Sequence, residues 1–276
     1  MPGYRTFKEV VESASSIYSS WRKVPTQTTG AGIWFDLCMS PGNPVPNYYA
    51  SSPLISVALS QSNNGGLFHG GNVSPKRKFL RKLTIMTPTA GAVPLYMLLC
   101  DYLLYYPFVD EGEPTQTLIT STSLPRYTDG DGVKVMAVVV AGQAGNQTFD
   151  ITYTNSAGVS GRTSSIVTTT TQAVNGTLIT GTIGPFIPLQ QGDKGVRSIE
   201  SVNFYTADVG LITLVLIKPL ATLTIRGVDA PVEVDYLQNF STMPRIYDDA
   251  YLNFICCPNG TLASANLSGD ITVNWE

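Results

Sequence analysis

The sequence predicts an all-β protein, with a β-sandwich or jelly-roll-like body and one amphipathic helix near the N-terminus. Three observations lead to this prediction. Beyond residue 30, apolar and polar residues alternate with a period of two rather than 3.6. Around a dozen apolar stretches follow at roughly ten-residue spacing, separated by turn residues. No helical pattern is interleaved with them, which argues against a parallel α/β sheet.

The composition indicates a chain that folds and also contacts other chains. Its 276 residues are 43% hydrophobic, which is too apolar for disorder and enough to bury a large core. Only 13% are charged, about half of the roughly 25% that is usual for soluble domains. A surface so poor in charge is typical of β-rich proteins that work in assemblies, and we expect other chains to cover part of it.

The N-terminal segment carries the helix prediction. Thr6 and Glu9 match a capping box, and Arg22 and Lys23 suit the negative end of a helix before Pro25. Apolar residues between these ends recur at spacings of three and four and form one stripe: Phe7, Val10, Val11, Ala14, Ile17, Tyr18 and Trp21. Two interpretations stay open. The stripe packs on the chain's own β domain, or a Gly/Thr-rich linker lets it reach a neighbouring subunit.

We therefore predict an N-terminal helix and linker in residues 1–30 and a β region in residues 31–276, as one unit or two subdomains. Ile33 and Phe35 open a short strand, the proline-rich segment 40–49 favours an extended arm, and residues 53–60 fit a short helix or strand. Twelve strands are then expected, at 79–86, 94–106, 133–141, 148–154, 164–171, 177–182, 196–206, 211–218, 223–226, 232–236, 251–257 and 271–275.

The charge is divided along the chain. Residues 1–100 carry a net charge of +6 and residues 101–276 a net charge of −9. Five cations lie together: Lys76, Arg77, Lys78, Arg81 and Lys82. Clustered cations can bind phosphates, but the overall pI of about 5.2 and the lack of a second basic cluster argue against nucleic acid. We predict that this run docks onto an acidic protein surface, on a second copy or on another assembly protein.

The residues that could perform chemistry are few. His69 lies in the string HGG, which occurs in esterase oxyanion loops, but the chain has no G-x-S-x-G nucleophile motif. Asp129 and Asp131 resemble the start of a calcium loop without its later ligands, so a hairpin turn explains them better. Two acidic groups, Asp248-Asp249 and Asp110 with Glu111 and Glu113, are interpreted as solvated loops or salt-bridge partners. We expect no enzyme activity.

No metal site or cofactor is predicted either. Cys38, Cys100 and the pair Cys256-Cys257 lack C-x-x-C spacing, and one histidine leaves few metal ligands. No export signal is visible at the start of the sequence. The most apolar window, 94–109, is shorter than a membrane span and contains Asp101. We expect this carboxylate to be buried and paired with Arg81 or Lys82.

Several stretches in the first half of the chain resemble virion structural proteins of tailed bacteriophages, specifically a head-associated group. They are GYRTFKEVVESASSIYSSWRKVPTQTTGAGIWFDLCMSPGNPVPNYY, LLCDYLLYYPFVD and SLPRYTDGDGVKVM. The resemblance implies a protein made in the host cytoplasm, with reduced cysteines, that joins the virion without catalysis. It does not distinguish a shell subunit from a decoration or tail protein. The common shell fold has a long spine helix, and no such helix is predicted beyond residue 23.

The leading hypothesis is therefore a capsid decoration or cement protein that binds the major capsid protein or other virion proteins and forms a homo-oligomer, with a trimer as the working guess. Two sets of residues are predicted to bind partners: the five cations above, and Phe7, Val10, Val11, Ile17 and Trp21 of the apolar stripe. The alternative is a receptor- or glycan-binding module on the virion, with tyrosines in segments 46–49 and 102–108 as stacking platforms. A jelly-roll glycoside hydrolase is a third interpretation.

Overall fold

The computed structural model of the chain describes residues 4–172, 174–180 and 183–276, and these residues form three antiparallel sheets. The shared sheet has the order β2 (Phe35–Asp36), β16 (Tyr251–Pro258), β6 (Leu95–Asp110), β13 (Leu211–Ile225) and β8 (Lys134–Ala141), and β4 (Val57–Ala58) also pairs with β6. The all-β prediction is confirmed.

The two smaller sheets come from different parts of the chain. The terminal sheet has the order β14 (Val232–Asp235), β5 (Lys78–Met86), β17 (Leu267–Trp275), β1 (Ser15–Lys23) and β3 (Gly42–Asn43), with β15 (Arg245–Ile246) also on β5. The distal sheet has the order β10 (Arg162–Thr163), β9 (Thr148–Asn155), β12 (Val196–Phe204) and β7 (Thr115–Thr117), with β11 (Val167–Thr168) also on β9. Helical elements are short: η1 (Glu9–Ser13), η2 (Leu37–Met39), α1 (Gln61–Asn64), η3 (Ala90–Ala92) and η5 (Tyr236–Thr242).

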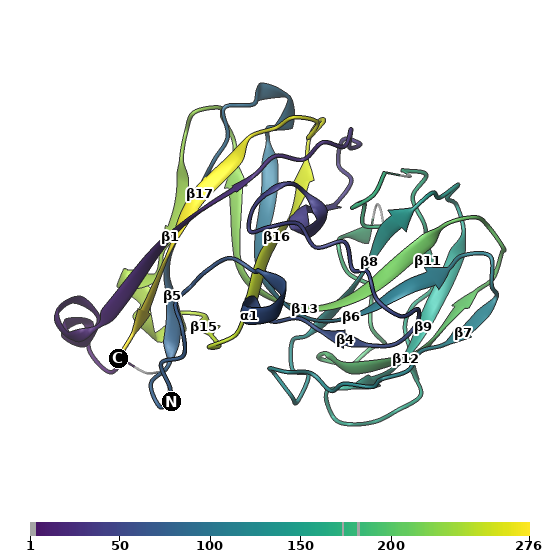
Figure 1. Cartoon of the computed structure of the whole chain (residues 1–276), viewed down its shortest axis with the longest axis horizontal. Coiled ribbons are helices and arrows are strands. Elements are labelled where there is room, and N and C mark those ends of the chain that lie inside the picture. The colour runs from purple at the N-terminus through teal and green to yellow at the C-terminus, as the bar shows by residue number, and fades with distance from the viewer. Residues whose placement is uncertain (1–3, 173, 181–182) are drawn as a thin grey trace.

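The molecule has two lobes, a terminal lobe that contains the terminal sheet and a distal lobe that contains the distal sheet. The long strands β6 and β13 pass through both (Figure 1). In the terminal lobe, Met97 and Leu223 of these strands pack with residues of the terminal sheet such as Leu83 and Ile271. In the distal lobe, Tyr106 belongs to a second core that includes side chains of the distal sheet. Each lobe is thus a sandwich of two layers, in which the shared sheet forms one layer and the terminal or distal sheet forms the other.

Irregular pairing keeps both cores on one face of the shared sheet. The register between β13 and β6 shifts between Leu216 and Ile217 and again between Pro219 and Ala221. Each bulge adds a residue to one strand, so the alternation of side chains restarts on the same face. A third apolar cluster lies on the other face of the sheet, where Tyr102 packs with Tyr49 of the proline-rich arm.

Asp101 of β6 lies where the two cores meet and forms a buried ion pair with Arg126. Arg126 donates two hydrogen bonds to the Asp101 carboxylate, at 2.9 and 2.7 Å, and one to the Tyr102 carbonyl at 2.9 Å. The backbone N–H of Tyr251 adds a fourth bond, to Asp101 Oδ1, at 3.1 Å. Burial raises the pKa of Asp101 to about 6, although Arg126 opposes the shift. The expectation of a buried, paired Asp101 is confirmed, but the partner is Arg126 rather than Arg81 or Lys82.

The N-terminal helix prediction is wrong beyond residue 13. The capping box forms, since Thr6 Oγ1 accepts from the Glu9 N–H at 3.2 Å and Glu9 Oε2 accepts from the Thr6 N–H at 3.4 Å. Only the short turn η1 follows, and from Ser15 the chain is strand β1, paired with β17 over nine residues. Ile17 and Trp21 are four residues apart, so they share a face in a helix and in a strand alike, and the Ser-rich segment has weak helix propensity.

Most other expected strands are present with shifted ends. Segments 211–218 and 223–226 form the single strand β13, and 164–171 yields only the two-residue β11. The described part of 177–182 makes single bridges, Phe35 with Thr177 and Val138 with Leu178, and residues 181–182 lie outside the described residues. The expected division at residue 30 stays a prediction. The described residues include no helix long and apolar enough to cross a membrane.

We expect Arg126→Met to lower the free energy of unfolding by about 3–5 kcal/mol at pH 7, because it leaves the Asp101 carboxylate buried without a counter-ion. The double variant Arg126→Met/Asp101→Leu removes that charge and should recover much of the loss. Urea unfolding of both variants measures the difference. Equal destabilisation of the single and double variants would show that the charge pair is not what holds the junction.

Candidate functional site

Two surface pockets are lined in part by residues that the sequence singled out. The first, the terminal groove, has a volume of about 420 Å³ and lies on the terminal sheet beside η1. Its lining joins Val10, Val11 and Ala14 from the N-terminal segment with Arg81 and Lys82 from β5. The predicted apolar and basic residues, some 70 positions apart in the sequence, therefore meet in one place.

The charges of the terminal groove are partly matched within the chain. Arg81 forms an ion pair with Asp235, and Lys82 Nζ lies 2.6 Å from Glu233 Oε2. Both carboxylates belong to β14, which pairs with β5. The two basic side chains remain partly exposed, at 17% and 37% of their surface. The acidic C-terminal half thus supplies partners for the basic run inside one molecule, while both cations still reach solvent.

The apolar stripe is divided between core and surface. Trp21 is buried in the terminal lobe, with its ring centroid 4.1 Å from that of Phe254, and Val10 is also buried. Ile17 packs partly against the same core as Trp21. Phe7 and Val11 are exposed over 53% and 56% of their surface. Of the five apolar residues that were predicted to bind partners, these two present most of their surface to solvent.

The second hollow, the lobe cleft, has a volume of about 390 Å³ and is lined by residues of both lobes, among them Lys76, Lys78, Arg126, Arg245 and Asp248. Lys76 and Arg77 are exposed, but Lys78 is buried. Replacing all three cations by acids would therefore disturb the fold, and only Lys76 and Arg77 can report on partner binding without doing so. Arg126 and Arg245 stand alone in the sequence, and no local pattern marked them as cleft residues.

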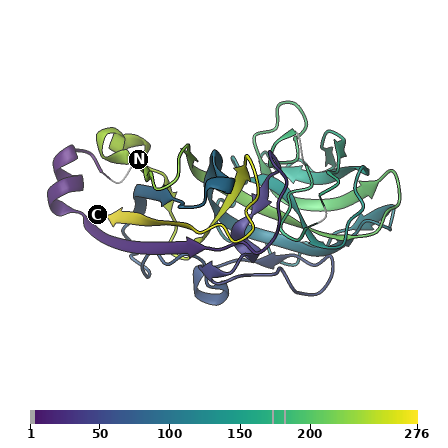
Figure 2. The same cartoon turned by 90° about the horizontal axis from the view of Figure 1, so that it is seen from above.

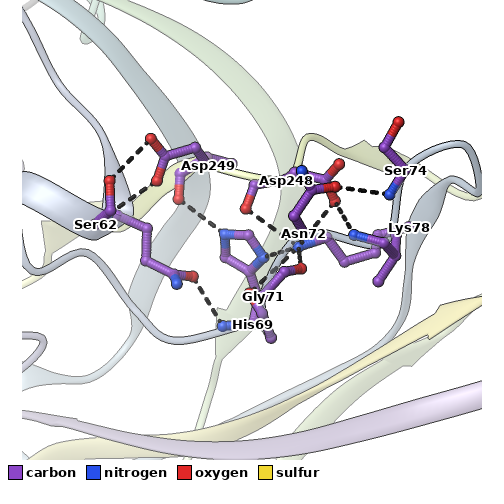
Figure 3. Close-up of polar contacts among 12 residues, drawn as sticks. Ser62, His69, Gly71, Asn72, Ser74, Lys78, Asp248 and Asp249 are labelled. Atoms are coloured by element: carbon purple, nitrogen blue, oxygen red, sulfur yellow. Dashed lines mark hydrogen bonds and ion pairs between the residues drawn. The ribbon is translucent and has the colours of Figure 1, made fainter.

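A buried polar network forms the wall of the lobe cleft at Lys78 (Figure 3). The Lys78 ammonium lies 3.0 Å from His69 Nδ1 and donates to the carbonyls of Gly71 and Asp248 at 3.0 and 3.2 Å. The Asp248 carboxylate is 3.4 Å away and accepts from the Val73 N–H at 3.1 Å. Desolvation lowers the pKa of Lys78, and the charge of Asp248 opposes the shift. The network ties the glycine-rich loop to the segment before β16.

Both ring nitrogens of His69 are engaged. Nε2 lies 2.9 Å from the Ala250 carbonyl, so it carries the proton, and Nδ1 accepts from Lys78. The ring is fully buried. Burial, together with the charge of Lys78, lowers the pKa of His69 to about 4. A neutral imidazole with no free nitrogen and no solvent contact holds loops together, and it has no lone pair or proton to exchange with a ligand in this arrangement.

We expect NMR to show the single imidazole titrating with a midpoint near pH 4 rather than 6.5. Because the folded state disfavours the protonated ring, this group's contribution to stability is fully present above pH 6.5 and is lost as the pH falls through 4. His69→Gln should remove about 3 kcal/mol of that pH dependence. A midpoint near 6.5 in the folded protein would contradict the network.

The acidic groups have different environments. Asp248 pairs with Lys78, as the salt-bridge interpretation expected, and Asp129 accepts from the Asp131 N–H at 3.1 Å in a turn with positive φ at Gly130 and Gly132. Glu111 departs from the solvated-loop expectation because it is fully buried, and neither carboxylate oxygen has a hydrogen-bond partner among the described residues. Burial, then the charges of Asp208 and Asp110, raise the pKa of Glu111 to about 7.

Glu111→Gln should stabilise the protein at pH 8 by on the order of 1–2 kcal/mol. The folded state binds this proton more tightly than the unfolded state, so its contribution is largest below pH 4.5 and is lost as the pH rises through 7. The gain should vanish near pH 4, as urea titrations at both pH values would show. Glu113→Gln, an exposed carboxyl two residues away, serves as the control and should change little.

The tyrosines that were expected as stacking platforms for a glycan are mostly core residues. Tyr49, Tyr102, Tyr105 and Tyr106 are buried, and Tyr48 alone among those of segments 46–49 and 102–108 is exposed. Segment 102–108 is not a loop but part of β6. Among the described residues, no group of three or more His, Cys, Asp or Glu side chains is placed to hold a metal ion. The four cysteines are free, and only Cys257 is partly exposed.

Comparisons with known proteins find no matching family model and no matching curated protein. Among solved structures, the infectious bursal disease virus VP2 subviral particle is 6% identical, with 99% of this chain and 83% of that chain covered and a TM-score of 0.20. The Gx strain of the same virus is 10% identical, with coverages of 100% and 84% and a TM-score of 0.22. These scores are too low to indicate a common fold. The strand pairing of the chain itself defines it as an all-β protein with two lobes.

Proposed function

We propose that the chain is a non-enzymatic structural protein of a virus particle, most specifically a decoration or cement protein on the head of a tailed bacteriophage. The observation that carries the proposal is the terminal groove, where Val11, Arg81 and Lys82 converge from two distant segments. Exposed apolar surface next to cations suits contact with another protein better than contact with solvent.

An accessible sheet edge lies next to this groove. Strand β1 pairs with β17 along its whole length, but on its other side β3 reaches only Arg22 and Lys23 in the described structure. Asn43 donates to the Ser20 carbonyl at 2.8 Å and so covers one more group. Residues 15–19 contain no lysine, proline or acid, the residues that usually prevent an edge strand from pairing with another chain. Tyr18 in this segment is 65% exposed.

Figure 2 places η1 and the end of β17 together at the far end of the terminal lobe. A partner that binds there would bury Val11 and Tyr18, extend the sheet along β1 and meet the cations of β5 at once. The partners that fit are a second copy of this chain and the major capsid protein or another virion protein. In this role the protein assembles in the host cytoplasm, resides in the virion and acts by burying apolar area and matching charge.

The resemblance of the first half of the sequence to head-associated phage proteins supports this assignment independently of the groove. The low content of charged residues also supports this assignment. A surface with so few charged side chains is solvated poorly by water and favours contact with other chains. The sequence hypothesis predicts a homo-trimer, and sedimentation velocity measures the number of copies.

Val11→Asp should remove the chain from purified particles and should also reduce its self-association in sedimentation velocity. The change places a charge in the middle of the apolar part of the groove at an exposed position, so folding is preserved. Val159→Asp is the matched control, since Val159 is 51% exposed and lies in the distal lobe. Native particles that lack the chain, or a Val11→Asp chain that still incorporates normally, would refute the proposal.

A further inference from the structure

We propose that the lobe cleft binds a small organic oxyanion, a molecule about the size of a monosaccharide that carries a carboxylate or phosphate group. The cleft lies between the lobes, and its lining is different from that of the terminal groove except for the shared strand β5. The inference therefore goes beyond the structural role proposed above and does not depend on it.

The lining of the lobe cleft is predominantly positive. Five Lys and Arg residues and two Asp residues line the cleft, a net charge of +3 in a chain whose total is −3. A concave wall with one sign of charge focuses the field and raises the local concentration of anions. The rest of the chain has a net charge of −6, so the cleft concentrates positive charge in a molecule that is acidic elsewhere.

The cations of the lobe cleft differ in whether a carboxylate already holds them. Lys78 and Arg126 are held by Asp248 and Asp101. Lys76 and Arg245 are exposed, and neither has an acidic partner within the described ranges. These two exposed cations have no carboxylate among the described residues that neutralises them, so an incoming oxyanion can pair with them. Because Asp248 and Asp101 already neutralise Lys78 and Arg126, the positive charge open to a ligand is that of the exposed cations.

The Arg245 side chain is held in place by an aromatic ring. Its guanidinium carbon lies 4.1 Å from the centroid of the Tyr247 ring, and that ring packs edge-on against Tyr127 at 4.8 Å. A guanidinium stacked on a ring loses less side-chain freedom when it binds, and its planar fork matches the two oxygens of a carboxylate or phosphate. Strand β15, paired with β5, fixes the backbone of Arg245.

The size of the cleft determines the size of the ligand. A volume of about 390 Å³ is within the range of small-molecule sites and is far larger than a bare phosphate or sulfate ion. Pro125 and Ile246 add apolar wall, and Asn63 offers an amide that can donate and accept. A ring with hydroxyl groups and one acidic substituent would use all of these, whereas a free ion would contact the cations alone.

Titration calorimetry with a matched set of probes tests the inference. Glucose and glucuronate differ only in the oxidised carbon, and glucose 6-phosphate and inorganic phosphate separate the sugar from the anion. We expect glucuronate or glucose 6-phosphate to bind at least about tenfold more tightly than glucose and than free phosphate, and added salt to weaken the binding. Equal affinity for glucose would refute the role of the charge, and equal affinity for free phosphate would refute the role of the sugar-sized body.

The double variant Lys76→Ala/Arg245→Ala should lose at least about tenfold in affinity. Lys194→Ala/Arg226→Ala is the matched control, because it removes the same charges at exposed positions outside the cleft, and it should bind as the wild type does. Unchanged binding by the first variant, or equal loss in both, would refute the site. Val11→Asp should leave sugar binding intact, so failure of the particle-binding proposal and failure of this one can be told apart.

Discussion

The structure depends on the pairing of β6 with β13, because this bulged ladder is part of both lobes. Thirteen partner positions connect the two strands, from Leu211 with Asp110 to Ile225 with Leu95. One end of the ladder closes the core under the terminal sheet and the other end closes the core under the distal sheet. The bulges near Ile217 and Pro219 bend the ladder without moving apolar side chains to the wrong face. The Asp101–Arg126 pair lies at the change between cores, because Leu99 on one side of Asp101 belongs to the first core and Leu103 on the other side belongs to the second.

The few charges of the chain are used mainly to connect segments that are far apart in the sequence. Lys78 joins the loop around Gly71 to the segment at Asp248, and Arg162 joins β10 to Asp193 through a 3.0 Å contact between Nε and Oδ2. Charges that are paired in this way are not available to bind a ligand, whereas Lys76 and Arg245 are available. The distinction between held and available cations, rather than the basic run as such, identifies the cleft as a place for an anion.

The fold class, most strands and the role of Asp101 could be predicted because they follow from local alternation and from the cost of a buried charge. The N-terminal helix could not be distinguished from a strand, since a spacing of four residues between Ile17 and Trp21 fits both periods and pairing with β17 decides between them. The five cations were found as a cluster, but the burial of Lys78 among them was not, because it depends on contacts with Asp248 some 170 residues later. The place of Arg245 and Tyr247 in the cleft could not be predicted, because only folding brings them next to the other residues of its lining.

The position of β17 has a consequence for biosynthesis. This strand lies between β5 and β1, and both of those strands are synthesised about 180 residues or more before it. Until residues 267–275 have left the ribosome, Trp21 and Leu83 lack the layer that links their strands. The distal lobe, whose strands are complete by residue 225, can form while translation continues. The terminal lobe must therefore wait for β17 to insert, which makes its closure a nonlocal event that cellular chaperones would meet as an open edge.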